Sequence, residues 1–215
     1  MSLLKTVLKK IYNSVGRSYP RIVAVGNHNV ETVDFIKKIN PKAIAEIGIY
    51  KGHTTMEIIK NISQDTELYL FDFDDRIKEI KVKLDNKGFK NYHLFGNTYK
   101  YLDSYNTSLN ALWSKVKTPI FDYVFLDGAH TFPIDCLTFF ICDKLLKKGG
   151  YIDFDDYNWD LVSSPSQGPK VFPLTKKLYS DQQIKEKGIK MIIENYILGN
   201  DNYKEIIKNK IYQKI

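Results

Sequence analysis

AIAEIGIYKGHT, residues 43–54, predicts a β-strand, a tight turn and the start of a helix. Ala43 to Ile47 is short and apolar, Gly48 and Gly52 lie in the following turn, and apolar side chains at helical spacing begin after Thr54. Glycines let a backbone pass close to a ligand, and a helix start offers free N–H groups. The stretch therefore predicts the first β-turn-α unit of an α/β domain, although two glycines alone are weak evidence for a ligand site.

The alternation of strand and helix continues along the chain. Strands are expected at Ala43 to Ile47, Glu67 to Phe71, Tyr92 to Phe95, Phe121 to Leu126 and Tyr151 to Phe154. Helices are expected at Leu3 to Ile11, at Val30 to Ile39, from Thr54 onward, at Arg76 to Lys87, and from Thr131 to the glycine pair at 149–150. This order predicts a doubly wound, mostly parallel, seven-stranded sheet that is covered by helices on both faces.

The last part of the chain predicts a C-terminal β-hairpin. Met191 to Leu198 and Tyr203 to Tyr212 are strand-like, and the polar residues 199–202 between them suit a turn. The final segment also fits a helix. The 215 residues contain no linker, so we expect one domain with an N-terminal helical segment (1–40), a cofactor-binding core (41–160) and a substrate-side segment (161–215).

Composition narrows the class of protein. Apolar residues make up 43% of the chain, enough for an ordinary core, and the formal net charge of +7 comes from dispersed lysines, so we expect no nucleic-acid partner. The two cysteines, Cys136 and Cys142, lie six apart in a predicted helix and cannot bridge each other, which favours a reducing cytoplasm. The sequence shows neither a long apolar run nor a secretory signal, so neither export nor a membrane span is expected.

Acidic side chains follow the second predicted strand. In an open parallel sheet, ligands bind beyond the carboxyl ends of the strands, and Asp72 stands at such an end. An acid at this place can accept both hydroxyls of a ribose. Alternatively, the acids at 72–75 only favour the N-terminus of the next helix.

EIGIYKGHT (46–54) and LYLFD (68–72) together resemble the first two motifs of class I S-adenosylmethionine-dependent methyltransferases. The resemblance implies that S-adenosylmethionine is the cofactor. It places Glu46, Gly48 and Gly52 around the methionine part and Asp72 on the ribose, with His53, Thr54 and Asp127 also near the cofactor. Asn97 follows the third strand, where the family often has an acid-bearing loop beside the adenine, and an asparagine can still contact an adenine amine.

FLDGAH (125–130) and GYIDFDDY (150–157) bring more carboxylates to strand ends. Asp127, Asp155 and Asp156 would converge beside the transferred methyl group, and carboxylates that close repel one another unless a cation such as Mg²⁺ neutralises them. Such an ion would also activate an acceptor hydroxyl. Both segments look like those of the metal-dependent sugar O-methyltransferases of macrolide and aminocoumarin biosynthesis, in which the matching acids bind the metal. Alternatively, the acids cap helices, contact the cofactor or remain solvated.

His130 is the candidate general base. Some of those sugar enzymes have a second acid where this chain has Ala129, and His130 follows directly. Imidazole is a competent base near neutral pH and could take the proton of an acceptor hydroxyl, with Asp127 as its catalytic neighbour. Alternatively, His130 belongs to the outer shell of the metal or only orders the loop.

The predicted function is metal-assisted methyl transfer from S-adenosylmethionine to a hydroxyl of a small acceptor, a sugar or glycan precursor first and a catechol-like molecule second, by an enzyme that could form a homo-oligomer. A nicotinamide-dependent oxidoreductase fits poorly, because GIYKG lacks the close G-x-G-x-x-G spacing. A cofactor-binding protein without catalysis is the second alternative. An RNA methyltransferase is the third, and it would require an RNA-binding surface that the sequence does not indicate.

Overall fold

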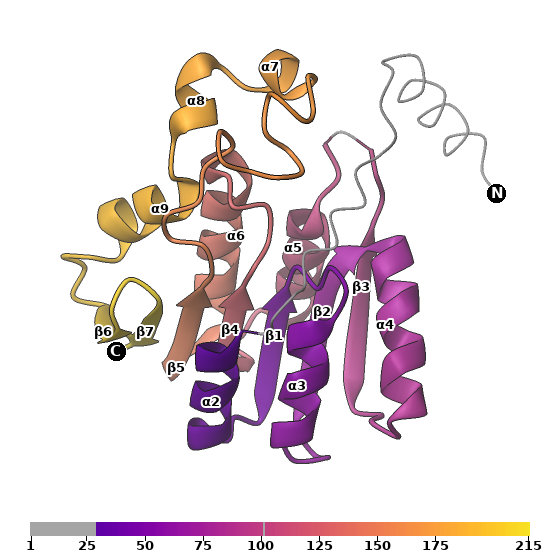
Figure 1. Cartoon of the computed structure of the whole chain (residues 1–215). Coiled ribbons are helices and arrows are strands. Elements are labelled where there is room, and N and C mark those ends of the chain that lie inside the picture. Colours follow the sequence, from indigo (N-terminus) through magenta and orange to yellow (C-terminus); the bar gives the residue numbers. More distant parts are fainter. Residues whose placement is uncertain (1–28, 101) are drawn as a thin grey trace.

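The computed structural model describes residues 29–100 and 102–215, and within them seven strands form one twisted sheet between two layers of helices (Figure 1). The strands are β1 (Ala43–Ile47), β2 (Glu67–Phe73), β3 (Tyr92–Asn97), β4 (Phe121–Leu126), β5 (Leu146–Phe154), β6 (Tyr203–Ile207) and β7 (Ile211–Lys214). Their order is β3-β2-β1-β4-β5-β7-β6. β1 to β5 pair in parallel, whereas β7 pairs antiparallel with β5 and with β6. The doubly wound, mostly parallel sheet is confirmed.

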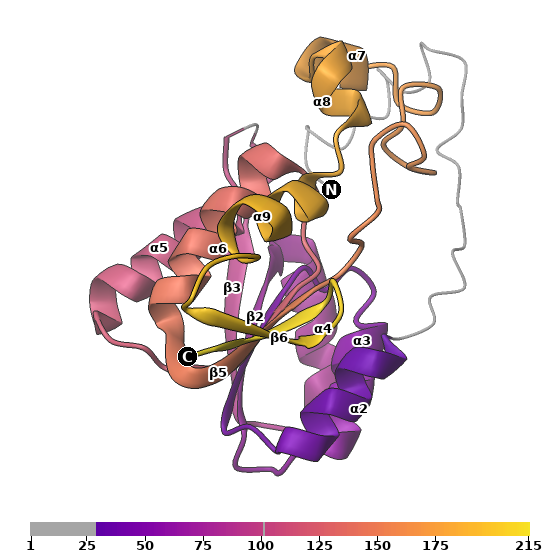
Figure 2. The ribbon, with the colours of Figure 1, turned by 90° about the vertical axis from the view of Figure 1, so that its left-hand side faces the viewer.

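The helices cover the sheet on both faces. They are α2 (Val30–Ile39), α3 (His53–Asn61), α4 (Asp74–Asn86), α5 (Tyr105–Val116), α6 (Phe132–Leu145), α7 (Thr175–Leu178), α8 (Asp181–Lys185) and α9 (Gly188–Tyr196). Figure 2 shows α2, α3 and α4 on one face and α5, α6 and α9 on the other. Alternate side chains of β1 enter separate cores, since Ala45 and Ile47 pack with the α5–α6–α9 side and Ile44 packs with the α2–α3–α4 side.

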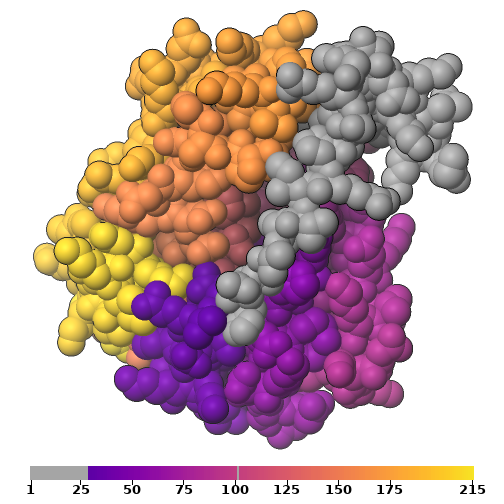
Figure 3. Space-filling model, viewed as in Figure 1, coloured from indigo at the N-terminus to yellow at the C-terminus, as the bar shows by residue number. Residues whose placement is uncertain are grey.

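The segment between β5 and α9 lies beyond the carboxyl ends of the parallel strands. It carries α7 and α8 and forms the orange part of the surface in Figure 3. The turns that follow β1, β2 and β4 reach the same end of the sheet (Figure 1). Polar residues that are far apart in sequence are therefore collected there.

The C-terminal hairpin is present, but its predicted first arm is wrong. Residues 188–196 form α9, in which Ile189, Ile192 and Ile193 are buried. This spacing of three and four is helical, and the β-branched composition of the segment had suggested a strand. The hairpin is instead folded within residues 203–214, with its turn at 208–210. α5, which carries its own N-cap at Ser104, was not predicted.

The remaining expectations concern the N-terminus, the cysteines and the membrane. The helix predicted at Leu3 to Ile11 lies outside the described residues. Cys136 and Cys142 both lie in α6 and are free thiols, as expected. In the described part of the chain, no helix has the length and apolar character that a membrane crossing requires.

Candidate functional site

The glycine turn after β1 is packed against the end of β4. Gly48 has φ +89°, and a Cβ at this position would lie 1.9 Å from the carbonyl oxygen of Asp127. Gly52, with φ +72°, is the N-cap of α3, and its own N–H donates to the carbonyl of Ile49. Both positions need glycine, because the backbone is left-handed and the space for a side chain is filled. The predicted turn therefore packs closely against its neighbours at both glycines.

Asp72 holds this turn in place. Its Oδ2 accepts the N–H groups of Ile49 and Tyr50, both at 2.7 Å, and its Oδ1 accepts the N–H of Phe73 at 2.6 Å. The side chain is only 9% exposed. A carboxylate offers about four acceptor positions, so these three bonds leave room for one more donor. Asp72 therefore joins the β1 turn to the end of β2.

Glu46 is buried beneath the same turn. Its Oε2 has no hydrogen-bond partner among the residues that the structure describes. Burial raises the pKa of Glu46 from its ordinary value of 4.5 to about 8; Thr55 opposes this shift, and the negative charge of Asp72 adds to it. A buried carboxyl oxygen without a partner indicates a position for a ligand that donates hydrogen bonds.

The pKa of Glu46 makes stability depend on pH. Between pH 4.5 and about 8 the folded state keeps a proton that the unfolded state loses, so the free energy of unfolding falls as pH rises through this window. This decrease should be roughly 3 to 5 kcal/mol in the wild type, and we expect it to be absent in Glu46→Gln. Urea denaturation of both proteins at about pH 5 and about pH 8 measures it. Parallel pH profiles for the two proteins would contradict a buried, neutral Glu46.

The two other residues predicted to lie near the cofactor, His53 and Thr54, are at the start of α3. Thr54 is half-buried, and its hydroxyl accepts the backbone N–H of Asn29 at 3.3 Å. His53 is the first residue of α3 and is exposed. Thr54 therefore ties α3 to the N-terminus of α2, while the imidazole of His53 lies at the surface.

Asn97 ends β3 and is 4% exposed. Its Nδ2 donates to the carbonyl of Thr98 at 3.3 Å, whereas its buried Oδ1 has no partner in the described chain. The free oxygen is an acceptor for an exocyclic amine, which is the contact expected from sequence.

Asp127 and His130 follow β4 and lie beside Asp156, which follows β5. The Nε2 of His130 is 3.6 Å from Asp127 Oδ1 and 3.6 Å from Asp156 Oδ2. Burial raises the pKa of Asp127 well above its usual value, and the carboxyls of Asp155, Glu46 and Asp156 add to this effect. These contacts bring the predicted catalytic pair into one cluster with a predicted metal ligand.

The backbone is left-handed at one residue in each of the loops that follow β4 and β5. His130 has φ +57° and Asp156 has φ +58°, values that residues other than glycine seldom adopt. The hydroxyl of Tyr105 accepts the N–H of Ala129 at 2.9 Å and donates to the buried Asp135. Backbone strain that surrounding contacts maintain is common at functional sites.

Asp155 lies beside Asp127 and also contacts groups outside this cluster. Its Oδ1 accepts the Nδ2 of Asn29 at 2.8 Å, and the Nζ of Lys210 lies 3.9 Å from the same oxygen. Lys210 also pairs with the buried Asp153 at 3.0 Å. An asparagine therefore bonds one oxygen of the carboxylate that was predicted to bind a metal, and a lysine lies near the same oxygen.

The predicted metal ligands Asp127, Asp155 and Asp156 do not form a ligand set in this arrangement. Within residues 29–100 and 102–215, no group of three or more His, Cys, Asp or Glu side chains is arranged to hold a metal ion. Asp155 Oδ1 is already bonded to Asn29, Asp127 contacts both Asp155 and His130, and Asp156 contacts His130. The side chains therefore do not fit a resident metal, and no step is assigned to one.

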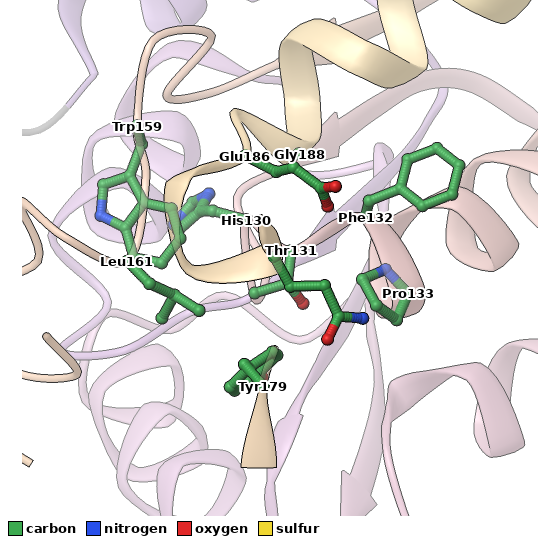
Figure 4. Close-up of a pocket in the computed structure, with 10 residues that line it drawn as sticks. His130, Thr131, Phe132, Pro133, Trp159, Leu161, Tyr179, Glu186 and Gly188 are labelled. Atoms are coloured by element: carbon green, nitrogen blue, oxygen red, sulfur yellow. The ribbon is translucent and has the colours of Figure 1, made fainter. Parts of the chain in front are cut away.

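A narrow pocket adjoins His130. It is lined by His130, Thr131, Phe132, Pro133, Trp159, Leu161, Tyr179, Gln183, Glu186 and Gly188 (Figure 4). The indole of Trp159 lies next to the imidazole, with ring centroids 5.3 Å apart. The cavity measures about 10 Å³, room for about one water molecule, so the segment that carries α8 must move before a larger molecule can enter.

Several residues that shape the site were not found from sequence: Asn29, Thr32, Tyr105, Asp135 and Lys210. Asn29 is recognisable as the N-cap of α2, where its side chain accepts the N–H of Thr32, but nothing in the sequence connects it with Asp155. Lys210 lies in a surface hairpin turn, where a lysine is unremarkable. The antiparallel pairing of β7 with β5 brings Lys210 to the end of β5.

The chain is similar to known methyltransferases in sequence and in fold. Residues 45–157 match a family model described as a methyltransferase domain. A protein of Acanthamoeba polyphaga mimivirus, described as uncharacterized protein R132, is 27% identical over 146 residues, which are 64% of this chain and 59% of that protein. The chain therefore spans about three fifths of the length of this relative.

Solved structures of methyltransferases share the fold. The O-methyltransferase of Bacillus cereus, in complex with S-adenosylhomocysteine (SAH), superposes with a TM-score of 0.58 and 14% identity, over 99% of this chain and 90% of that one. The SAH-bound methyltransferase of Podospora anserina gives a TM-score of 0.56 and 16% identity, over 85% of this chain and 75% of that one. At such identities the likeness is one of fold.

Proposed function

This chain belongs to the methyltransferase-domain family, and from that premise we propose that it transfers a methyl group from S-adenosylmethionine to a hydroxyl oxygen of a small acceptor. The observation that carries the proposal is the unpartnered, buried Oε2 of Glu46 beneath a glycine turn that leaves no space for a side chain. The site asks for a ligand with a hydrogen-bond donor at that oxygen, and the amino group of the cofactor's methionine part supplies one.

The turns after β1, β2 and β3, called the cofactor half of the site, would each contact a different part of S-adenosylmethionine. Glu46, Gly48 and Gly52 would surround the methionine part, Asp72 would hold the ribose with its remaining acceptor position, and Asn97 Oδ1 would accept the adenine amine. Thr54 would support the turn from α3. His53 is exposed, so its contribution would be limited to the edge of this half.

Replacement of Asp72 tests this division. Asp72→Ala removes the acceptor of the Ile49 and Tyr50 N–H groups as well as the ribose contact, so SAH affinity should fall by roughly tenfold or more. Asp75→Ala is the matched control, because Asp75 lies in the first turn of α4 and bonds Tyr99. Calorimetry measures both, and equal affinities for the two variants would contradict the ribose assignment.

The acceptor half would carry out the transfer. When bound, S-adenosylmethionine supplies a methyl carbon made electrophilic by its sulfonium. The acceptor oxygen would bond this carbon as the carbon–sulfur bond breaks and its electron pair stays on sulfur, and His130 would take the hydroxyl proton. Asp127 and Asp156, each 3.6 Å from Nε2, stabilise the imidazolium that forms.

The acceptor would be a hydroxylated small molecule, a sugar or glycan precursor in the first place. Trp159 and Tyr179 offer faces on which a sugar ring can stack, and Gln183 and Glu186 offer hydrogen bonds to hydroxyls. Incubation with methyl-labelled cofactor and a panel of free sugars, nucleotide sugars, catechols and RNA tests the proposal. Label in a sugar methyl ether supports it, whereas label confined to catechols or RNA would overturn the choice of acceptor.

The predicted assistance by Mg²⁺ is not carried into this mechanism. Since the described side chains do not form a ligand set, the proposed transfer takes its proton acceptor and its charge stabilisation from His130 and the neighbouring carboxylates.

A further inference from the structure

Lys210 is fixed at the carboxyl end of β5 by the C-terminal hairpin. Ile211 pairs with Asp153 in the antiparallel register of β5 and β7, and the carbonyl of Lys210 accepts the N–H of Phe154 at 2.9 Å. The N–H of Lys210 donates to the carbonyl of Ile207 at 3.1 Å across the hairpin turn. The backbone at Lys210 is therefore anchored on both sides, and its side chain starts from a defined position.

The ammonium of Lys210 enters a buried polar cluster. Its Nζ lies 3.0 Å from Asp153 Oδ1 and 3.9 Å from Asp155 Oδ1, and the side chain is only 13% exposed. The other oxygen of Asp153 accepts the hydroxyls of Thr32, at 2.6 Å, and Tyr123. Nζ also lies 5.6 Å from the centroid of the Phe125 ring. Charges in such a partly dehydrated place interact strongly.

Lys210 lies among crowded carboxyl groups. Five carboxyl groups gather at the ends of β1, β4 and β5: Glu46, Asp127, Asp153, Asp155 and Asp156. Lys210 already contributes a positive charge beside Asp155, and a divalent ion at the same oxygen would be repelled by it.

We propose that the ammonium of Lys210 takes the place of a divalent metal in this chain, balancing the carboxylates of the transfer site and holding Asp155 against Asn29. Lys210 is thus a positioning residue that acts through Asp155 and Asp153. Its importance for catalysis rests on the proposed function, but the exchange of lysine for metal does not. Metal binding can therefore be tested without an acceptor.

Titration with Mn²⁺, followed by the paramagnetic resonance signal of the free ion, tests the exchange in the full chain. The wild type is expected to show no saturable Mn²⁺ site below millimolar concentrations. Lys210→Met is expected to gain one site that binds Mn²⁺ roughly tenfold tighter or better, because it exposes Asp153 and Asp155 to an external cation. Lys208→Met, at an exposed lysine of the same turn, is expected to behave as the wild type.

Two outcomes would overturn the proposal. One is a micromolar Mn²⁺ site in the wild type that Asp155→Asn removes. The other is a Lys210→Met protein that gains no affinity for Mn²⁺. A failure of methyl transfer with every acceptor would sink the proposed function and leave both of these results decisive.

A folding control keeps the test sharp. Lys210→Met leaves Asp153 buried without its partner, so the variant could be too unstable to titrate. Lys210→Arg keeps the charge and is expected to retain the wild-type lack of Mn²⁺ binding. The double variant Asp153→Asn with Lys210→Met removes the buried charge and still leaves Asp155 open to Mn²⁺, so a gain of affinity is expected there too. Thermal melting of all variants reports which are folded.

Discussion

Asp127→Asn is expected to lower methyl transfer by roughly 100-fold or more while SAH affinity changes by a few-fold at most. Asp127 lies 3.6 Å from the Nε2 of His130, and in the proposed mechanism it is one of the two carboxylates that stabilise the imidazolium formed when His130 takes a proton. An asparagine keeps the shape of the side chain but removes the charge. Single-turnover labelling measures transfer, and calorimetry measures binding.

The same substitution should not weaken the fold. Burial and the carboxyls of Asp155, Glu46 and Asp156 raise the pKa of Asp127, so the amide relieves repulsion that the wild type carries. The melting temperature of Asp127→Asn is therefore expected to equal or exceed that of the wild type. Residues that serve activity often destabilise the fold. Loss of SAH binding together with transfer would instead make Asp127 a cofactor ligand and contradict its assigned role.

Gly48→Ala is expected to have the largest effect on the cofactor half. A Cβ at this position would lie 1.9 Å from the carbonyl oxygen of Asp127, and φ is +89°. The β1 turn or the β4 loop must shift to accommodate it, which separates Glu46 and Asp72 from their positions around the turn. We expect a loss of roughly 3 kcal/mol or more of stability, and SAH affinity too weak to measure by calorimetry.

Gly88→Ala is the matched control for this substitution. Gly88 also has a left-handed backbone, with φ +72°, but a Cβ there meets nothing within 4 Å. It isolates the conformational penalty of alanine, about 1 kcal/mol, from the steric clash. Chemical denaturation and SAH titration of both variants make the comparison. If Gly48→Ala were as mild as Gly88→Ala, the close approach of the two loops would have no part in forming the site.

The sequence predicts the local features of the fold and the position of Asp72 beside the turn after β1. Apolar runs such as Ala43–Ile47 predict strands because both faces of a parallel sheet are buried. The carboxyl ends of such strands meet at one edge of the sheet. The sequence alone therefore predicts that Asp72 lies next to the turn after β1. These inferences need only spacing and topology.

Contacts between distant segments could not be predicted in this way. Asn29 reaches Asp155 across 126 positions, and Lys210 reaches Asp153 only because β7 pairs antiparallel with β5. The sequence shows acids that need a cation, which favours a metal, but it does not show that a lysine from the last hairpin lies beside them. The strand predicted at 191–198 was wrong for a different reason. Its β-branched residues favour a strand, but their spacing is helical, and most of the segment lies in α9.

The central claim is that this chain binds the methyl-donor cofactor at the turn after β1. Calorimetric titration of the full chain with SAH, once with Mg²⁺ and once with a chelator, tests it most directly. The account predicts one micromolar site whose affinity is the same in both titrations. Absence of binding in both would contradict the claim, and binding only with Mg²⁺ would contradict the metal-free site described for Asp127, Asp155 and Asp156.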